Sequence, residues 1–174
     1  MPGSGGPGHG VTAPFTAYHQ EEDASLSGKT MVVLKVAAMV KARQERLIVA
    51  SISTATLEFM GCLLKKDGFI CHELTGETLM SDRGRIVTEL NDPSSKGHVL
   101  LLSIKAGGTG LNLTGANNLV LVEPSLNPCA DEQAIARIYR PGQCKDVFIY
   151  LLVAGDTRAI EMQVMMLQVS HKTQ

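Results

Sequence analysis

The segment HVLLLSIKAGGTGLNLTGANNLVLVE, residues 98–123, decides the fold of this chain. It begins with an apolar run at 98–104 and ends with a second one at 118–122, and neither run alternates with polar residues. Strands that are apolar on both faces are typical of a parallel sheet whose two faces are covered by helices. Three glycines at 107–110 stand between the two runs, so the backbone can turn tightly there.

The same pattern continues on both sides of this segment. Further strand-like runs lie at 47–51, 69–74 and 146–153, and segments of helical length separate the runs. The predicted helices are residues 29–43, 54–68, 80–91, 129–140 and 156–170. This alternation predicts an α/β fold, a parallel sheet with helices on both faces. In such open sheets a ligand binds beyond the carboxyl ends of the strands, so a site is expected in the loops that follow them.

The composition fits one globular domain behind a polar leader. The chain has 174 residues, 44% of them hydrophobic, and a net charge of −1. Residues 1–25 are polar and rich in glycine, so we expect them to be a disordered leader and residues 26–174 to form the domain. The near-neutral charge neither requires nor excludes a nucleic-acid partner, because binding needs only a local basic surface. We expect no membrane span and no signal peptide, since no apolar run is suited to either.

The cysteines give no sign of a metal site. Cys62, Cys71, Cys129 and Cys144 show no C-x-x-C spacing, and no histidine lies at the spacing of a zinc ligand. We expect four reduced thiols, as in a nuclear or cytosolic protein.

Gly28-Lys29-Thr30 is the triplet that ends a phosphate-binding P-loop, but the rest of that motif is missing. The pattern G-x-x-x-x-G-K-[ST] needs glycine at the position of Asp23 and an apolar strand before the turn. A carboxylate at that position would repel the phosphates. We therefore interpret the triplet as the opening turn of a helix, with Ser27 as its N-cap.

The loop after the central strand is the first candidate site. Lys105, Gly107, Gly108 and Gly110 follow the end of the strand 98–104. Their spacing fits neither the dinucleotide fingerprint G-x-G-x-x-G nor a P-loop. Two interpretations stay open: contact between the backbone and a phosphate, or a tight turn from a strand into a helix.

The stretch DEQAIARIYRPGQ, residues 131–143, is the second candidate site. On a helix Gln133, Arg137 and Arg140 would share one face, because they are four and three residues apart. Neither arginine has a carboxylate four residues away. The pair could therefore bind an external polyanion through bidentate hydrogen bonds, and the alternative is a solvated basic face.

Taken in order, these stretches resemble the second RecA-like lobe of superfamily-two helicases, specifically the Swi/Snf-type ATPases. LLSIKAGGTGLNLTGANNLVLVEPSLNP is similar to the family's motif V and its extension, and DEQAIARIYRPGQ to motif VI. The most specific part is Arg-x-x-Arg-x-Gly-Gln, whose final Gln143 favours the Swi/Snf branch over RNA helicases. LTGETLMSDRGRIVTELN resembles the Leu-Asp-Gly-Ser-Thr stretch of the family and its following arginine, carried here by Gly76, Thr78 and Arg83.

The resemblance covers residues 26 to about 155 and includes several departures. Motif IV usually reads Phe-Ser-Gln, which is Ala50-Ser51-Ile52 in this chain. Three further positions differ from the residue common in the family: Thr75 and Glu123 for aspartate, and Leu126 for tryptophan.

The resemblance implies that ATP with Mg²⁺ binds between two RecA-like lobes. The first lobe supplies the P-loop and the Asp-Glu box, which this sequence lacks, so we expect the isolated chain to be inactive. Arg140 would be the arginine finger that neutralises charge on the γ-phosphate, while Arg137 would brace the phosphates or the closed lobe interface. Nucleotide binding or coupling is implied for Gly107, Gly108, Gly110, Asn112 and Gln133.

DNA contacts are implied for Ser51, Ser103, Lys105 and Thr114, which would hold the phosphate backbone of one strand. Such binding is independent of sequence and sensitive to salt. The implied function is ATP-dependent translocation along double-stranded DNA, in chromatin remodelling or DNA repair in the nucleus. The implied partners are DNA or nucleosomes and the first lobe of the same protein.

Two other interpretations stay open. The chain could be a catalytically incomplete lobe that serves as a DNA- or protein-binding scaffold, because the motif IV glutamine and the first lobe are both absent. It could also be another nucleotide-binding enzyme, such as a small kinase that uses Lys29.

Overall fold

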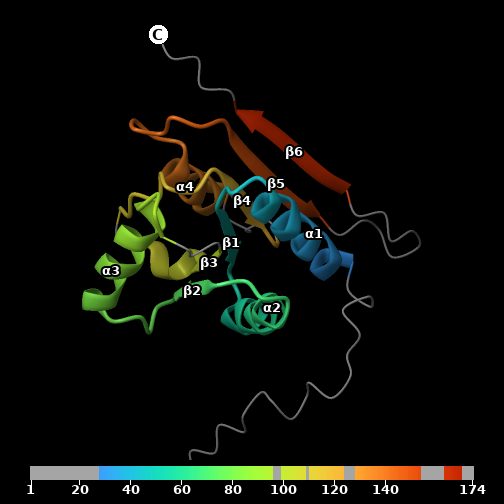
Figure 1. Ribbon diagram of the computed structural model, residues 1–174, viewed down its shortest axis with the longest axis horizontal. Helices are drawn as coiled ribbons and strands as arrows, with labels where there is room; N and C mark the ends of the chain where they lie inside the picture. Colours follow the sequence, from blue (N-terminus) through green and yellow to red (C-terminus); the bar gives the residue numbers. More distant parts are fainter. Residues whose placement is uncertain (1–27, 96–98, 109, 124–127, 154–162, 170–174) are drawn as a thin grey trace, which may run out of the picture.

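The computed structural model describes residues 28–95, 99–108, 110–123, 128–153 and 163–169, which form a sheet flanked by helices (Figure 1). The strands are β1 (Leu47–Ser51), β2 (Cys71–Leu74), β3 (Val99–Ser103), β4 (Asn118–Leu121), β5 (Val147–Val153) and β6 (Gln163–Val169). Within this part of the chain their order is β2-β3-β1-β4-β5-β6. Strands β1 to β5 pair in parallel, which confirms the predicted sheet.

In the described residues four α-helices cover the two faces of this sheet, which confirms the predicted α/β architecture. They are α1 (Gly28–Ala42), α2 (Thr54–Lys66), α3 (Met80–Asn91) and α4 (Pro128–Ile138). Figure 1 shows α1 and α2 on one side of the sheet and α3 and α4 on the other. A short 3₁₀ helix, η3 (Ile104–Gly108), follows β3 directly.

Strands β1 to β5 contribute to two hydrophobic cores because successive side chains point to opposite faces. In β1, Leu47 and Val49 pack with α1 and α2, whereas Ile48 and Ala50 pack with α3 and α4. All five residues of β1 are buried, and so are all five of β3. Burial on both faces is the physical reason why these strands lack polar alternation in the sequence.

Both ends of α2 and the start of α1 agree with signals in the sequence. Ser53 is the N-cap of α2 and accepts a hydrogen bond from the backbone N–H of Thr56. Gly68 follows α2 with φ of +76°, a left-handed conformation that suits glycine, and so ends the helix as predicted. α1 begins at Gly28, which agrees with the triplet as the opening turn of a helix, and Ser27 lies outside the described residues.

The prediction of a closing helix at 156–170 is wrong for residues 163–169. These residues form β6, which pairs with β5 antiparallel, from Gln163 opposite Val153 to Val169 opposite Val147. The run VMMLQV is apolar without clear periodicity, and such a run fits a strand or a buried helix equally well. The remaining residues of that segment, like the expected leader at 1–25, lie outside the described part of the chain.

The described residues contain no helix with the length and hydropathy that crossing a membrane requires. They also contain no cluster of three histidine, cysteine or carboxylate side chains suited to a metal ion.

Candidate nucleotide and DNA site

The carboxyl ends of β1 and β3 bring two predicted DNA contacts together. Ser51 and Ser103 are direct partners in the parallel register, and both side chains are buried. The Ser51 hydroxyl donates to Glu123 Oε1 at 2.5 Å, and the N–H of Ile52 donates to the same oxygen at 2.8 Å. Glu123 therefore ties the end of β1 to the segment after β4. The predicted DNA contacts of both serines stay predictions.

The glycine-rich loop is a tight turn from a strand into a helix. β3 ends at Ser103, and η3 begins with the next residue and ends at Gly108. Lys105 and Gly110 are exposed beside the carboxyl ends of the strands, while Gly107 and Gly108 lie within η3. The exposed ammonium of Lys105 at this edge is suited to a phosphate, while contact between the backbone of the loop and a phosphate stays a prediction.

Arg83 joins two loops at this edge, and the sequence did not predict that role. Its guanidinium donates to the carbonyl oxygens of Thr78, Thr75 and Gly76, all in the turn between β2 and α3, at 2.9 to 3.3 Å. It also donates to Ala106 O of η3 at 3.1 Å. The arginine after Gly76 was a family marker, but hydrogen bonds to backbone carbonyls leave no trace in sequence spacing.

The predicted arginine finger lies beyond the helix that was expected to carry it. α4 ends at Ile138, so Arg140 is not on a common helical face with Gln133 and Arg137, and that prediction is wrong. The Pro-Gly pair at 141–142 explains the early end, because proline disfavours helical geometry in the residue before it. Gln133 is exposed on α4, one turn before Arg137.

Both arginines adjoin the segment that follows the glycine-rich loop. The N–H of Leu113 donates to the carbonyl of Arg137 at 3.1 Å, and Nη1 of Arg140 donates to Leu111 O at 3.4 Å. Arg137 is 8% exposed, and desolvation lowers the pKa of its guanidinium. The guanidinium stays charged, since arginine is not deprotonated in proteins. Arg137 is thus buried at the end of α4, against the segment that follows the glycine-rich loop, and its contact with phosphate stays a prediction.

The side chain of Lys29 makes a hydrogen bond within the fold. Its ammonium donates to the carbonyl of Val122 at 2.7 Å, and so connects the first turn of α1 to the end of β4. This contact argues against the alternative of a small kinase that uses Lys29.

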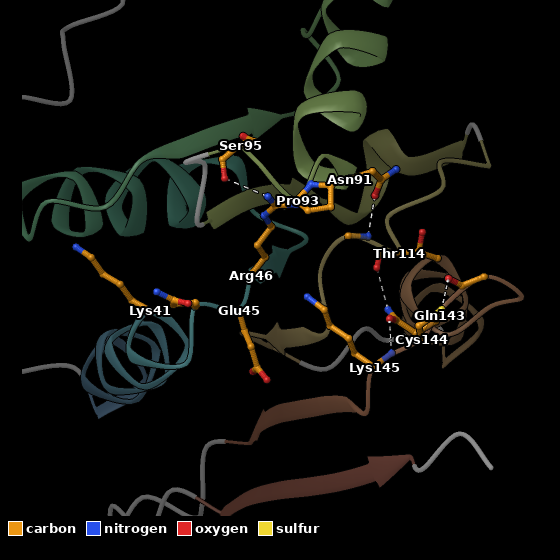
Figure 2. A pocket seen from close by; sticks show the side chains of 13 residues that line it. Lys41, Glu45, Arg46, Asn91, Pro93, Ser95, Thr114, Gln143, Cys144 and Lys145 are labelled. Carbon is orange, nitrogen blue, oxygen red and sulfur yellow. Dashed lines mark hydrogen bonds between the residues drawn. The ribbon is translucent and has the colours of Figure 1, made fainter. Parts of the chain in front are cut away.

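A cavity of about 800 Å³ lies at the opposite, amino-terminal edge of the sheet (Figure 2). Its wall includes Arg46, whose buried guanidinium donates to the carbonyls of Leu90, Asp92 and Ser95. Thr114 also lines this cavity. The structure therefore does not bring Thr114 together with the two serines and Lys105, and its DNA contact stays a prediction.

Asn112 also lies toward this amino-terminal edge. Its carbonyl accepts a hydrogen bond from the side chain of Asn91, the last residue of α3, at 2.8 Å. The structure thus groups Asn112 with the end of α3, while the two serines and Lys105 lie at the other edge.

The fold and these loops define the C-terminal lobe of a helicase-type ATPase. The chain belongs to the Helicase conserved C-terminal domain family, whose model matches residues 29–142. It is a C-terminal RecA-like lobe of the Swi/Snf type, as the sequence predicted.

Curated relatives of this chain are DNA repair and chromatin proteins. It is 41% identical over 151 residues to DNA repair protein rhp54 of Schizosaccharomyces pombe. The matched region covers 86% of this chain and 17% of that protein. It is 39% identical over 151 residues to DNA repair and recombination protein RAD54-like of Homo sapiens, covering 86% and 20%. With Protein CHROMATIN REMODELING 25 of Arabidopsis thaliana it shares 40% over 146 residues, covering 83% and 16%. The chain thus spans no more than about a fifth of these relatives.

A solved structure supports the fold. The C-terminal part of the Fun30 ATPase domain superposes with a TM-score of 0.69 and 30% sequence identity. The match covers 78% of this chain and 44% of the Fun30 chain.

Proposed function

We propose that this chain is the second motor lobe of an ATP-dependent translocase that moves along double-stranded DNA. Arg140 is the arginine finger, Arg137 braces the phosphates or the closed lobe interface, and the exposed Lys105 holds the DNA backbone. The observation that carries the proposal is the contact of both arginines with residues 111–113, which continue directly from the Lys105 loop. Hydrogen bonds to residues 111 and 113 therefore connect the two arginines to the loop that is proposed to contact DNA.

The side chain of Arg140 fits the role of a finger. It is half-buried, and within the described residues its one hydrogen bond is the 3.4 Å contact with Leu111 O. A guanidinium has five N–H donors, so Arg140 keeps donors for a phosphate. Arginine fingers increase turnover on the order of 10³- to 10⁵-fold by neutralising charge in the transition state.

ATP with Mg²⁺, held mainly by the first lobe, supplies the phosphoryl group that is transferred to water. This chain contributes positive charge near the γ-phosphate and contacts with one DNA strand. Since the DNA contacts are made to phosphates, binding is independent of sequence and weakens with salt. The names of the relatives favour a nuclear protein of DNA repair or chromatin remodelling that acts on DNA or nucleosomes.

The alternative is a catalytically incomplete lobe that binds DNA or protein as a scaffold. Two observations support it: Ile52 stands where motif IV usually has glutamine, and the Ser51 hydroxyl already donates to Glu123. The two candidates differ in whether the lobe completes an ATPase site.

Complementation of the two lobes separates the candidates. We compare ATP turnover by the chain alone with turnover by the two-lobe protein, the intact ATPase in which this lobe follows a P-loop-bearing first lobe. A motor lobe predicts negligible turnover by the chain alone and turnover stimulated by double-stranded DNA in the two-lobe protein. DNA binding by a two-lobe protein that shows no stimulated turnover would support the scaffold.

A further inference from the structure

Two side-chain amides hold residues 111–116, which we name the linking segment, and nothing in the proposed mechanism assigns these amides a role. The linking segment follows the Lys105 loop and leads into β4. Leu111 and Leu113 contact the two arginines through the hydrogen bonds described above. The position of the linking segment therefore sets the position of both arginines relative to the loop.

Asn91 binds the linking segment at two points. Its Nδ2 donates to Asn112 O at 2.8 Å, and its Oδ1 accepts from the N–H of Gly115 at 2.7 Å. One donor and one acceptor are used, which fixes the orientation of the amide. Because Asn91 is the last residue of α3, these bonds attach the linking segment to the end of that helix.

Gln143 binds the linking segment from the other side. Its Nε2 lies 3.1 Å from Thr114 O and 2.9 Å from Ala116 O, and 3.4 Å from Ile138 O at the end of α4. Its Oε1 accepts from the N–H of Lys145 at 3.0 Å. The side chain is 6% exposed, so replacement of its donors would leave buried carbonyls without partners.

Gly115, which lies between the residues bound by these two amides, allows the linking segment to pack closely against α3. A Cβ at this position would lie 2.0 Å from Leu90 O and 2.5 Å from the Cα of Asn91. The backbone of the linking segment thus lies directly against the end of α3, at a distance that only glycine permits. Figure 2 shows Asn91 and Gln143 on the wall of the cavity, on either side of Thr114.

From this arrangement we propose that Asn91 and Gln143 are positioning residues for DNA-stimulated ATP hydrolysis. They hold the linking segment at a fixed place between α3 and α4, so that contact of DNA with the Lys105 loop is transmitted to Arg137 and Arg140. Neither amide touches ATP or DNA in this mechanism. The inference rests on the proposed function, because it needs the two arginines to act on phosphate.

Two variants remove the donors with little change of shape. In Asn91→Asp the bond to Asn112 O is lost and the acceptor for Gly115 remains. In Gln143→Glu a carboxylate replaces the group that faces three carbonyl oxygens. The matched control is Gln44→Glu, which places the same charge at an exposed position on the wall of the same cavity. If circular dichroism shows that Gln143→Glu does not fold, the test uses Asn91→Asp, since Asn91 is partly exposed at the end of α3.

The first measurement is amide hydrogen exchange in the 174-residue chain, which needs no ATPase activity. We expect Gln143→Glu to accelerate exchange at Leu113 and Gly115 at least about tenfold, and Asn91→Asp, which keeps the acceptor for Gly115, to do so at Leu113, while Leu101 in β3 stays protected. The control should leave all three amides unchanged. Unchanged exchange at Leu113 in both variants would contradict the proposal that the two amides hold the linking segment.

The second measurement is turnover by the two-lobe protein. We expect kcat with double-stranded DNA to fall on the order of 10²-fold in both variants, as for a misplacement of about 1 Å, with KM for ATP nearly unchanged. Accelerated exchange with wild-type kcat would overturn the positioning role. If the wild-type two-lobe protein itself shows no DNA-stimulated turnover, the proposed function and the positioning role both fail. The exchange result then shows only whether the two amides hold the linking segment.

Discussion

The guanidinium of Arg83 on α3 donates to the carbonyl of Ala106 in η3 at 3.1 Å, across 23 residues of sequence. The same side chain binds three carbonyls in the turn after β2. Arg83 therefore connects the glycine-rich loop to the turn after β2, at the edge of the sheet where DNA is proposed to bind.

Arg83→Ala should lower the free energy of unfolding by about 1–3 kcal/mol, because four carbonyls lose a charged donor. Urea denaturation measures this change. The matched control is Arg85→Ala on the same helix. Arg85 is 60% exposed and pairs only with Asp82 and Glu89 in the described residues, so its loss should change stability by less than about 0.5 kcal/mol. Equal effects of the two substitutions would contradict the role of Arg83.

Two glycine substitutions should change the free energy of unfolding in opposite directions. In Gly115→Ala the new Cβ would overlap backbone atoms of Leu90 and Asn91, so we expect a loss of at least about 2 kcal/mol. Gly84→Ala lies inside α3 on its exposed side, where a Cβ meets nothing within 4 Å. Alanine there should raise stability by about 0.5–1 kcal/mol, because it restricts the unfolded chain. A stable Gly115→Ala variant would show that the linking segment can move away from α3.

Cys71 should be the least reactive of the compared cysteines. Burial raises the pKa of its thiol to about 11, whereas Cys62 and Cys144 are exposed. Since only the thiolate is alkylated, iodoacetamide at pH 8 should modify Cys62 and Cys144 well before Cys71, as peptide mass spectrometry would record. Equally rapid labelling of Cys71 in the folded chain would rule out this protection.

The same thiol predicts a change of stability with pH. Its pKa is raised from 9.0 in the unfolded chain to about 11 in the folded chain, so its contribution is fully present below pH 9. Between pH 9 and 11 the unfolded chain loses the proton first, and the free energy of unfolding should fall. The fall should be smaller in Cys71→Ala. An identical pH dependence of the variant and the wild type would contradict the assignment.

The sequence predicts the sheet well because burial on both faces leaves unbroken apolar runs, as in β1 and β3. It predicts the closing segment wrongly because an apolar run such as VMMLQV carries no period. It places Arg140 on the helix because the spacing from Arg137 fits, while the Pro-Gly pair ends the helix earlier. The amides of Asn91 and Gln143 are invisible to spacing, since they bind backbone atoms that only the tertiary fold brings near.

The central claim is that Arg140 acts on the γ-phosphate, and DNA-stimulated ATP turnover by Arg140→Ala in the two-lobe protein tests it most directly. Arg85→Ala serves as the control, because it removes an equal charge from an exposed position on α3. We predict that kcat of Arg140→Ala falls by at least about 10³-fold while ATP affinity is retained. Turnover within a few-fold of the wild type, with the control also active, would contradict the claim.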